Sequence, residues 1–197
     1  EKEKKDLYIE GIQNNGIINH YEYIINSEGT IEIRHVLKPE GKMPLWFPRI
    51  GLTLTVSDAL DQVKWYGRGP QENYPDRKTG YPTGIYASTV QAMYEPYLMP
   101  QDYGLRTDVR WLQLTTDKGI GLQFKMNEWF NFNIYPYSTD NLTKAMYTYQ
   151  LQKQKGMTLN LDYATTGVGC TARGVFGAYK AMPQEYRRTI SIRPMMK

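Results

Sequence analysis

Apolar and polar residues alternate with a period of two along most of this chain, and this alternation constrains the fold more than any other sequence feature. A strand points successive side chains to opposite faces, so the pattern is typical of strands with one buried face. In one segment Ile31, Ile33 and His35 fall on one side, while Glu32 and Arg34 fall on the other. The alternation predicts strands over residues 18–26, 30–37, 49–56, 62–66, 108–115, 119–126, 131–135, 158–163 and 188–192.

Turn and helix signals between these segments complete the predicted fold. Turn-forming residues at 26–29 and 117–119 each predict a hairpin. Ser138 is placed to cap a short helix over residues 140–145. Residues 67–104 are rich in Gly, Pro and Tyr and too long for a hairpin loop, so we expect a functional loop or a segment packed across the sheets. Residues 1–197 are therefore expected to form a single all-β domain, a large antiparallel β-sandwich.

Charge and cysteine content exclude several kinds of site. The net charge is +4, from 24 Lys and Arg against 20 Asp and Glu, and the basic residues are not clustered. Nucleic-acid binding needs such a cluster, so we expect no nucleic-acid partner. No apolar run approaches the ~20 residues of a membrane span, so we expect no membrane partner. With one cysteine, Cys170, and two histidines, His20 and His35, we expect no disulfide within the chain, no metal site and no cofactor.

The densest group of chemically useful side chains lies between residues 65 and 77. It combines aromatic rings, two carboxylates, two arginines and turn-forming residues, and three interpretations compete. The first makes Glu72 and Asp76 an acid/base pair, since glycoside hydrolysis usually uses two carboxyl groups about 5–10 Å apart. Nearby arginines lower a carboxylate pKa and make it a poor proton donor, so we consider this interpretation the weakest of the three.

The second interpretation of this segment is sugar binding. Aromatic rings would stack on a pyranose, and polar side chains would bond its hydroxyls. The residues concerned are Trp65, Tyr66, Tyr74, Asn73, Asp76 and Arg77.

The third interpretation, which we favour, is a structural lock that does not bind sugar directly. Two prolines fix the backbone φ angle and stiffen the segment. Arg68 and Arg77 can each make a forked bond to a carboxylate. Glu72 and Asp76 are the nearest carboxylates in sequence. The aromatic rings of the segment would pack beneath this frame.

Two further clusters carry weaker signals. Arg106 and Arg110 share a face if their segment is a strand, because even spacing points the same way. Two arginines on one buried face indicate carboxylate partners within an interface. Residues 167–174 resemble a Gly-rich phosphate loop only superficially, since no Gly-Lys-Ser/Thr ending is present and no helix is predicted after them. We expect a flexible surface loop there.

The order of these motifs resembles the C-terminal, small-chain β-sandwich domain (domain 5) of glycoside hydrolase family 2 β-galactosidases. The long motif Trp65-Tyr66-Gly67-Arg68-Gly69-Pro70-Gln71-Glu72-Asn73-Tyr74-Pro75-Asp76-Arg77 carries most of the resemblance. Later motifs agree with it in order: Met93-Tyr94-Glu95-Pro96-Tyr97, Pro100-Gln101, Gly104-Leu105-Arg106, Arg110 and Gly167-Val168-Gly169. The resemblance covers most of the chain from about Tyr21 onward.

This resemblance implies a fold and a division of labour. The family domain is a large β-sandwich, a supersandwich similar to galactose mutarotases, and begins upstream of Glu1, so the chain resembles its later part. The catalytic glutamates of the family lie in a separate (β/α)₈ barrel. The resemblance thus implies an accessory domain of a retaining β-galactosidase that hydrolyses terminal β-D-galactosides. On its own the chain is expected to be inactive, with no catalytic residue and no cofactor.

The resemblance also suggests which residues reach substrate and which partners the chain has. In well-known relatives a loop after the Gly-x-Gly run carries a tryptophan into the active site. Here the matching residues 170–176 contain no Trp, and Arg173 and Phe176 are the bulky candidates for the rim. Expected partners are a β-galactoside or oligosaccharide and the remaining domains of the parent chain, while a homo-oligomer stays open. The bacterial periplasm or cytoplasm is the expected compartment.

Two alternatives from other functional classes remain. An aromatic share of 13%, with 17 Tyr and 4 Trp, on a sandwich scaffold suits a free-standing carbohydrate-binding module. A mutarotase-like epimerase would share the fold alone. Such enzymes need a catalytic His and a Glu, and the two histidines here both fall in the first predicted hairpin, which makes this alternative weak.

Overall fold

A computed structural model describes residues 6–9, 15–170 and 174–196 of the chain. Strands dominate these residues, and every strand pairing is antiparallel, which confirms the predicted all-β class. The strands are β1 (Asp6–Ile9), β2 (Asn15–Ile25), β3 (Ile31–Gly41), β4 (Arg49–Val56), β5 (Gln62–Arg68), β6 (Thr83–Thr89), β7 (Arg106–Thr115), β8 (Gly121–Tyr135), β9 (Met157–Thr165) and β10 (Tyr186–Met195). The helical elements are α1 (Thr139–Lys144) and the 3₁₀ turns η1 (Thr148–Gln150) and η2 (Gly177–Tyr179).

The observed strands differ from the predicted ones in three places. The segments predicted over 119–126 and 131–135 form one continuous strand, β8, of 15 residues. The sequence prediction missed β6 inside the supposed loop 67–104, and it also missed β1. Both missed strands end the path of the sheet and pair with one neighbour each. An edge strand buries less apolar surface, so its alternation is a weaker signal.

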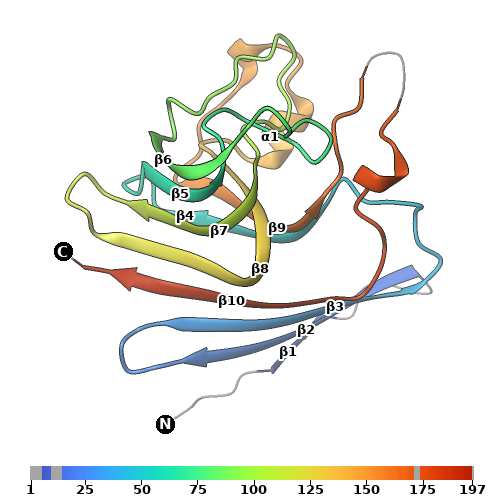
Figure 1. The fold of residues 1–197 in the computed structure, drawn as a ribbon, viewed down its shortest axis with the longest axis horizontal. Coiled ribbons are helices and arrows are strands. Elements are labelled where there is room, and N and C mark those ends of the chain that lie inside the picture. The colour runs from blue at the N-terminus through green and yellow to red at the C-terminus, as the bar shows by residue number, and fades with distance from the viewer. Residues whose placement is uncertain (1–5, 10–14, 171–173, 197) are drawn as a thin grey trace.

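Strand β8 joins the two layers of the sandwich. It pairs with β7 from Gly121 to Phe132. It also pairs with β10 in its first part, up to Met126, and with β9 in its last part, from Asn131 onward. The main sheet runs β1-β2-β3-β10-β8-β7-β5-β6, and β4 and β9 branch from the end of β8 (Figure 1). Five residues separate the end of β4 from the start of β5, so the chain passes from the β4–β9 branch to the main sheet through a short connection.

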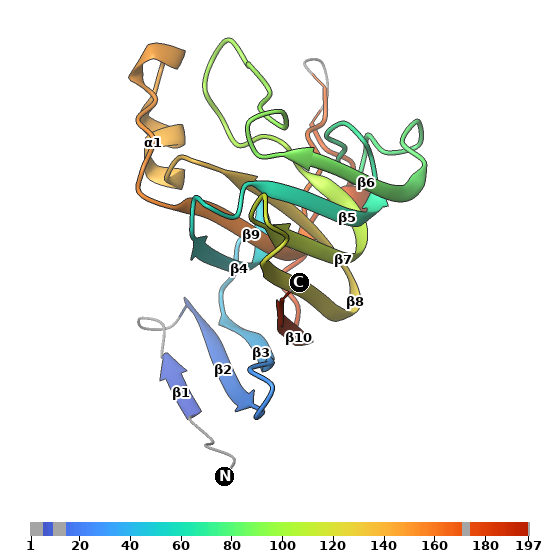
Figure 2. The ribbon, with the colours of Figure 1, turned by 90° about the vertical axis from the view of Figure 1, so that its left-hand side faces the viewer.

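One hydrophobic core lies between these layers. Alternate residues of β5 and β9 point into it, as do those of β8 on either side of its exposed residues 127–129. Its largest fully buried side chains include Trp65, Phe124, Phe132, Leu159 and Leu161. Strands β1, β2 and β3 extend from this body on the side of β10 (Figure 2).

The smaller layer consists of β4, β9 and the last part of β8, and loop segments cover its outer face. A second cluster forms where Tyr103 and Leu142 pack against Tyr135 of β8. The long segment before β7 thus packs across a sheet, which is one of the two outcomes expected for it. Ser138 caps α1 as predicted, and its hydroxyl accepts a 3.1 Å hydrogen bond from the backbone N–H of Asn141.

Candidate functional site

The motif of residues 65–77 begins in the last residues of β5 and continues into the loop that leads to β6. Trp65 is fully buried, and its indole N–H donates a 3.0 Å hydrogen bond to the carbonyl of Arg68. The guanidinium of Arg106 lies 5.4 Å from the Trp65 ring centroid. Tyr74 is 5% exposed. Neither ring therefore presents a face on which a sugar could stack, and both pack beneath the loop.

Glu72 is the central acceptor of this loop. Its carboxylate accepts hydrogen bonds from the backbone N–H of Gly104 at 2.9 Å and from the Tyr74 hydroxyl at 3.1 Å. It also accepts one from the Tyr97 hydroxyl, and it forms an ion pair with Arg77 at 2.6 Å. The predicted pairing of Arg77 with a nearby carboxylate is confirmed for Glu72.

These donors decide the ionisation of Glu72. Burial raises the pKa of its carboxyl, but the bonds from Tyr97, Gly104, Arg77 and Tyr74 outweigh burial and leave the pKa below its usual value. A carboxyl held ionised and surrounded by donors is a poor proton donor. Glu72 is thus built as a structural acceptor, which argues against an acid/base pair in this loop.

Arg68 pairs with a partner that the sequence prediction did not name. Its Nε lies 2.5 Å from Oδ2 of Asp108, and Lys78 binds the same carboxylate at 2.8 Å. We expected Glu72 or Asp76 as the partner of Arg68, and that prediction was wrong. Arg68 ends β5 beside the first part of β7, so a β7 residue lies nearer than its own loop.

Asn73 ties the loop to the segment that enters β7. Its backbone N–H donates a 2.8 Å bond to the carbonyl of Leu105. Its side-chain oxygen accepts bonds from the hydroxyl and the backbone N–H of Thr107, at 2.5 and 3.1 Å. Asn73 is fully buried, so it is not available to bind a sugar hydroxyl.

The carboxylate of Asp76 accepts hydrogen bonds from backbone N–H groups and does not pair with an arginine in the described part of the chain. Its two carboxylate oxygens accept hydrogen bonds from the backbone N–H groups of Val168 at 3.0 Å and Gly169 at 2.7 Å. A Cβ placed on Gly167 would lie 2.3 Å from Cγ of Asp76, so only glycine fits there. The motif loop and the Gly-Val-Gly segment, treated separately in the sequence, therefore form one structural unit.

The expected rim residues follow this unit in the chain. Phe176 is 64% exposed, while Arg173 lies outside the described residues. Tyr179 and Trp46 are both partly exposed. Their two segments lie side by side, because Phe47 forms a bridge with Ala181. The sequence analysis did not single out Trp46, since it lies in an irregular segment far from the recognised motifs.

Arg106 and Arg110 do not share a face. Arg106 stacks on buried Trp65, whereas Arg110 lies 4.0 Å from the ring centroid of Trp129, which is 60% exposed. Between them Asp108 has a φ of 55°, and the pairing of β7 with β8 shifts on both sides of Val109. This irregularity breaks the two-residue period on which the prediction depended.

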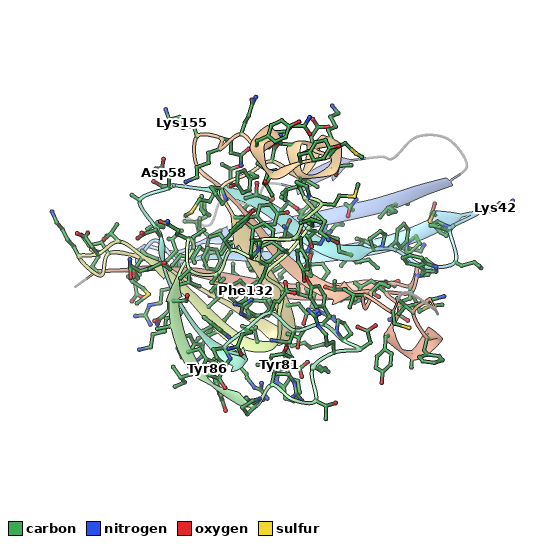
Figure 3. The ribbon with its side chains drawn as sticks, turned by 90° about the horizontal axis from the view of Figure 1, so that it is seen from above. Lys42, Asp58, Tyr81, Tyr86, Phe132 and Lys155 are labelled. Atoms are coloured by element: carbon green, nitrogen blue, oxygen red, sulfur yellow. The ribbon has the colours of Figure 1, made fainter. Side chains whose placement is uncertain are left out.

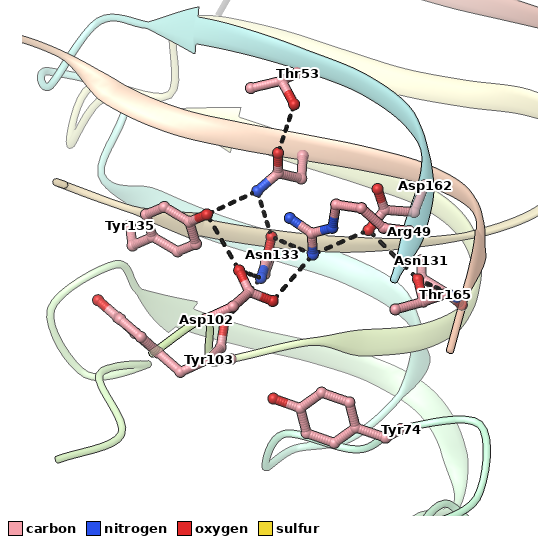
Figure 4. Close-up of polar contacts among 12 residues, drawn as sticks. Arg49, Thr53, Tyr74, Asp102, Tyr103, Asn131, Asn133, Tyr135, Asp162 and Thr165 are labelled. Carbon is pink, nitrogen blue, oxygen red and sulfur yellow. Dashed lines mark hydrogen bonds and ion pairs between the residues drawn. The ribbon is translucent and has the colours of Figure 1, made fainter. Parts of the chain in front are cut away.

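A second polar cluster, which the sequence analysis did not detect, lies on the outer face of the smaller layer (Figure 4). Arg49 at the start of β4 places Nη2 3.1 Å from Asp102 and 3.2 Å from Asp162 of β9. Asn133 of β8 donates to Asp102 at 2.9 Å, and Tyr135 does so at 3.1 Å. No short motif could reveal this network, because it draws on three strands and a loop.

Asp162 is the most perturbed carboxyl of this network. Burial raises its pKa to about 7, and the Arg49 guanidinium opposes the shift. Two carboxylates near each other, one with a raised pKa, invite comparison with a glycosidase pair. However, the Asp162 side chain is 2% exposed and Arg49 bridges the two carboxylates, so a substrate has no access to it. The network is built to hold β4, β8 and β9 together.

Other kinds of site were sought in the described residues. Among residues 6–9, 15–170 and 174–196, no helix has both the length and the apolar character needed to cross a membrane. No group of three or more His, Cys, Asp and Glu side chains in that part of the chain could hold a metal ion. Cys170 is exposed and has a free thiol.

Comparison with known proteins adds an independent finding. Residues 4–192 match the sequence model of the family described as β-galactosidase small chain. The chain is 38% identical over 147 residues to a β-galactosidase of Priestia megaterium, which covers 75% of this chain and 14% of that protein. It is 33% identical over 159 residues to a β-galactosidase of Pseudoalteromonas haloplanktis, covering 79% of this chain and 14% of that protein.

The matched share of each protein sets the scope of this finding. The chain spans about 14% of the length of these two relatives, and 11% of a Vibrio cholerae β-galactosidase to which it is 39% identical over 122 residues. The family match covers nearly the whole chain, including all the motifs that carried the resemblance. This chain therefore belongs to the β-galactosidase small-chain family.

Proposed function

We propose that this chain is an accessory domain of a retaining β-galactosidase of glycoside hydrolase family 2, which hydrolyses terminal β-D-galactosides. In this proposal it forms part of the active-site rim and packs on other domains of the parent enzyme. The two catalytic glutamates lie outside it. The observation that carries the proposal is the match of residues 4–192 to the β-galactosidase small-chain family. The hydrogen bonds from Val168 and Gly169 to Asp76 fix the segment that precedes Phe176 in the chain.

The two parts of this unit have different roles in the proposal. Phe176 is exposed and apolar, so its ring suits the C–H face of a galactose unit. Glu72 and Asn73 have their polar atoms engaged within the protein and act only on the position of the loop. Sugar contact is thus assigned to Phe176, and rigidity is assigned to the motif of residues 65–77.

A hydrolysis assay tests the inactivity of the chain. The purified 197-residue chain is incubated with a chromogenic β-galactoside, and release of the leaving group is followed. No turnover is expected, because the proposal places both catalytic glutamates outside this chain. Turnover that persists through repurification and is lost on mutation of a residue in this chain would contradict the proposal.

Substitutions in the parent enzyme test the rim assignment. Phe176→Ala should raise KM about two- to tenfold, the value of an aromatic contact, with an unchanged melting temperature. Tyr149→Ala is the matched control, since Tyr149 is 79% exposed and lies in η1, outside the segment that contains Phe176. Arg77→Ala should lower the melting temperature and leave turnover of the folded enzyme near normal. Unchanged kinetics in Phe176→Ala would show that Phe176 does not form the rim.

A further inference from the structure

A cavity of about 610 Å³ opens at the end of the sandwich opposite the motif loop. It lies where β4 and β8 end and where β5 and β9 begin, and Asp58 and Lys155 mark this end of the molecule in Figure 3. Its volume falls within the range of about 300–1,000 Å³ that is usual for small-molecule sites. The lining residues that matter here are Asp58, Asp61, Gln91, Tyr94, Tyr103 and Tyr137.

Three tyrosines converge on this cavity. Tyr94 and Tyr103 meet edge to face with ring centroids 5.3 Å apart, and Tyr137 packs against the same cluster. Burial raises the pKa of Tyr103, and the neighbouring phenols of Tyr137 and Tyr94 raise it further. Within the described part of the chain, none of the three hydroxyls bonds another protein group. The cavity therefore offers ring surface together with hydroxyls that a ligand can engage.

The rest of the lining is polar and offers both donors and acceptors. Asp58 and Asp61 supply carboxylates, and Gln91 supplies an amide. Asp61 uses Oδ1 to accept from Gln62 at 3.0 Å, which leaves Oδ2 for another donor. Gln154 donates to Thr158 at 2.9 Å, which leaves its carbonyl oxygen for a ligand.

This lining selects one chemical class of ligand. A pyranose has apolar C–H faces that stack on aromatic rings and edge hydroxyls that both donate and accept. A wholly apolar ligand would leave the tyrosine hydroxyls and the carboxylates without hydrogen-bond partners. An anion would face two aspartates, and an organic cation would face Lys153. We propose that this cavity is a non-catalytic site that binds a saccharide unit of an oligosaccharide.

The proposed saccharide site is separate from the proposed rim and does not depend on it. The cavity lies at the start of β9, at Met157, and the rim loop leaves β9 after Thr165. A strand rises about 3.3 Å per residue, so these two points are roughly 25 Å apart. The proposal thus adds a second binding site to the accessory role proposed for the chain.

The binding test uses the chain itself and involves no turnover, so its outcome is distinguishable from that of the rim proposal. The ¹⁵N-labelled chain is titrated with lactose, cellobiose and maltose, and with choline as the cationic probe. At least one disaccharide should shift the amide signals of Val90, Gln91 and Gly156 in a saturable way. Absence of such shifts with all three, shifts confined to other surfaces, or saturable shifts with choline alone would overturn the proposal.

Substitutions locate the binding more sharply. Tyr137→Phe keeps the ring and removes one hydroxyl, and Gln91→Ala removes an amide. Each should weaken binding of the responding disaccharide about two- to tenfold, the value of one net hydrogen bond. Tyr149→Phe is the matched control, because Tyr149 stacks on Tyr147 with both rings exposed outside the cavity. Weaker binding in the control together with unchanged binding in Tyr137→Phe and Gln91→Ala would place the site elsewhere and overturn the assignment.

Discussion

Asp76 accepts a 2.7 Å hydrogen bond from the backbone N–H of Gly169, a residue 93 positions later in the chain. The bond joins the loop after β5 to the loop after β9, so two motifs that are distant in sequence act as one unit. It also explains why the Gly-Val-Gly segment contains no larger residue at its first position, since the carboxylate fills the space beside Gly167. Residues 167–169 are thereby held against the body of the sandwich.

Gly167→Ala is expected to destabilise the chain by about 1–3 kcal/mol, because the new methyl group would overlap the Asp76 carboxylate and displace it from its two donors. Gly174→Ala is the matched control, since a Cβ at Gly174 meets nothing within 4 Å. Urea unfolding of both variants measures the difference. Equal stability of the two variants would mean that Asp76 does not pack against Gly167 in this way.

Glu72→Ala should lower the free energy of unfolding by about 3–5 kcal/mol. The substitution leaves Arg77 unpaired and removes the acceptor of the buried donors on Tyr74 and Gly104. Arg77→Ala should cost only about 1 kcal/mol, because its side chain is 46% exposed and much of its interaction is screened. Chemical denaturation gives both values.

Lys144→Ala provides the control for Glu72→Ala and Arg77→Ala. Lys144 pairs with Asp140 on the surface of α1, and both side chains are at least 70% exposed. The loss of such a pair should change stability by no more than about 0.5 kcal/mol. A loss in Glu72→Ala no greater than in this control would disprove the central role of Glu72.

His35 should make the chain sensitive to acid. Its ring bonds Tyr163 at 2.7 Å and Asn19 at 2.9 Å, and burial lowers its pKa to about 4 from 6.5. A depressed pKa contributes stability that is present above pH 6.5 and is lost as the pH falls toward 4. His35→Gln should therefore lose less stability than the native chain between pH 7 and 4.5 in urea titrations. An identical pH dependence in the variant would rule out His35 as the source.

Asp162 should act in the opposite sense over a similar range. Its pKa is raised to about 7 from 3.8, so its contribution to stability is fully present below pH 3.8 and is lost as the pH rises through 7. Asp162→Asn cannot ionise, so its stability should fall less than that of the native chain between pH 5 and 8. Thermal unfolding at a series of pH values checks this. A steeper fall in the variant would show that Asp162 stays ionised across the range.

Local patterns determined the parts of this protein that depend on neighbours in sequence. The two-residue period predicted β4 over Arg49–Val56 and placed Ile33 and His35 on one buried side of β3. Ser138 was identified as a cap because capping uses residues three positions apart. The Glu72–Arg77 pair was found because both residues lie in one short loop. The order of motifs was sufficient to identify the family, which the family match confirms.

Only the tertiary structure decided which distant elements meet. Arg68 pairs with Asp108 because β5 and β7 are neighbours in the sheet, and Asp76 meets Gly169 because the loops after β5 and β9 converge. The polar network of Arg49 and the tyrosine-lined cavity likewise draw on strands and loops spread along the chain. Alternation fixes which way a side chain points, but not which strand lies opposite, since that depends on how β8 passes between the layers and on the irregular pairing near Asp108.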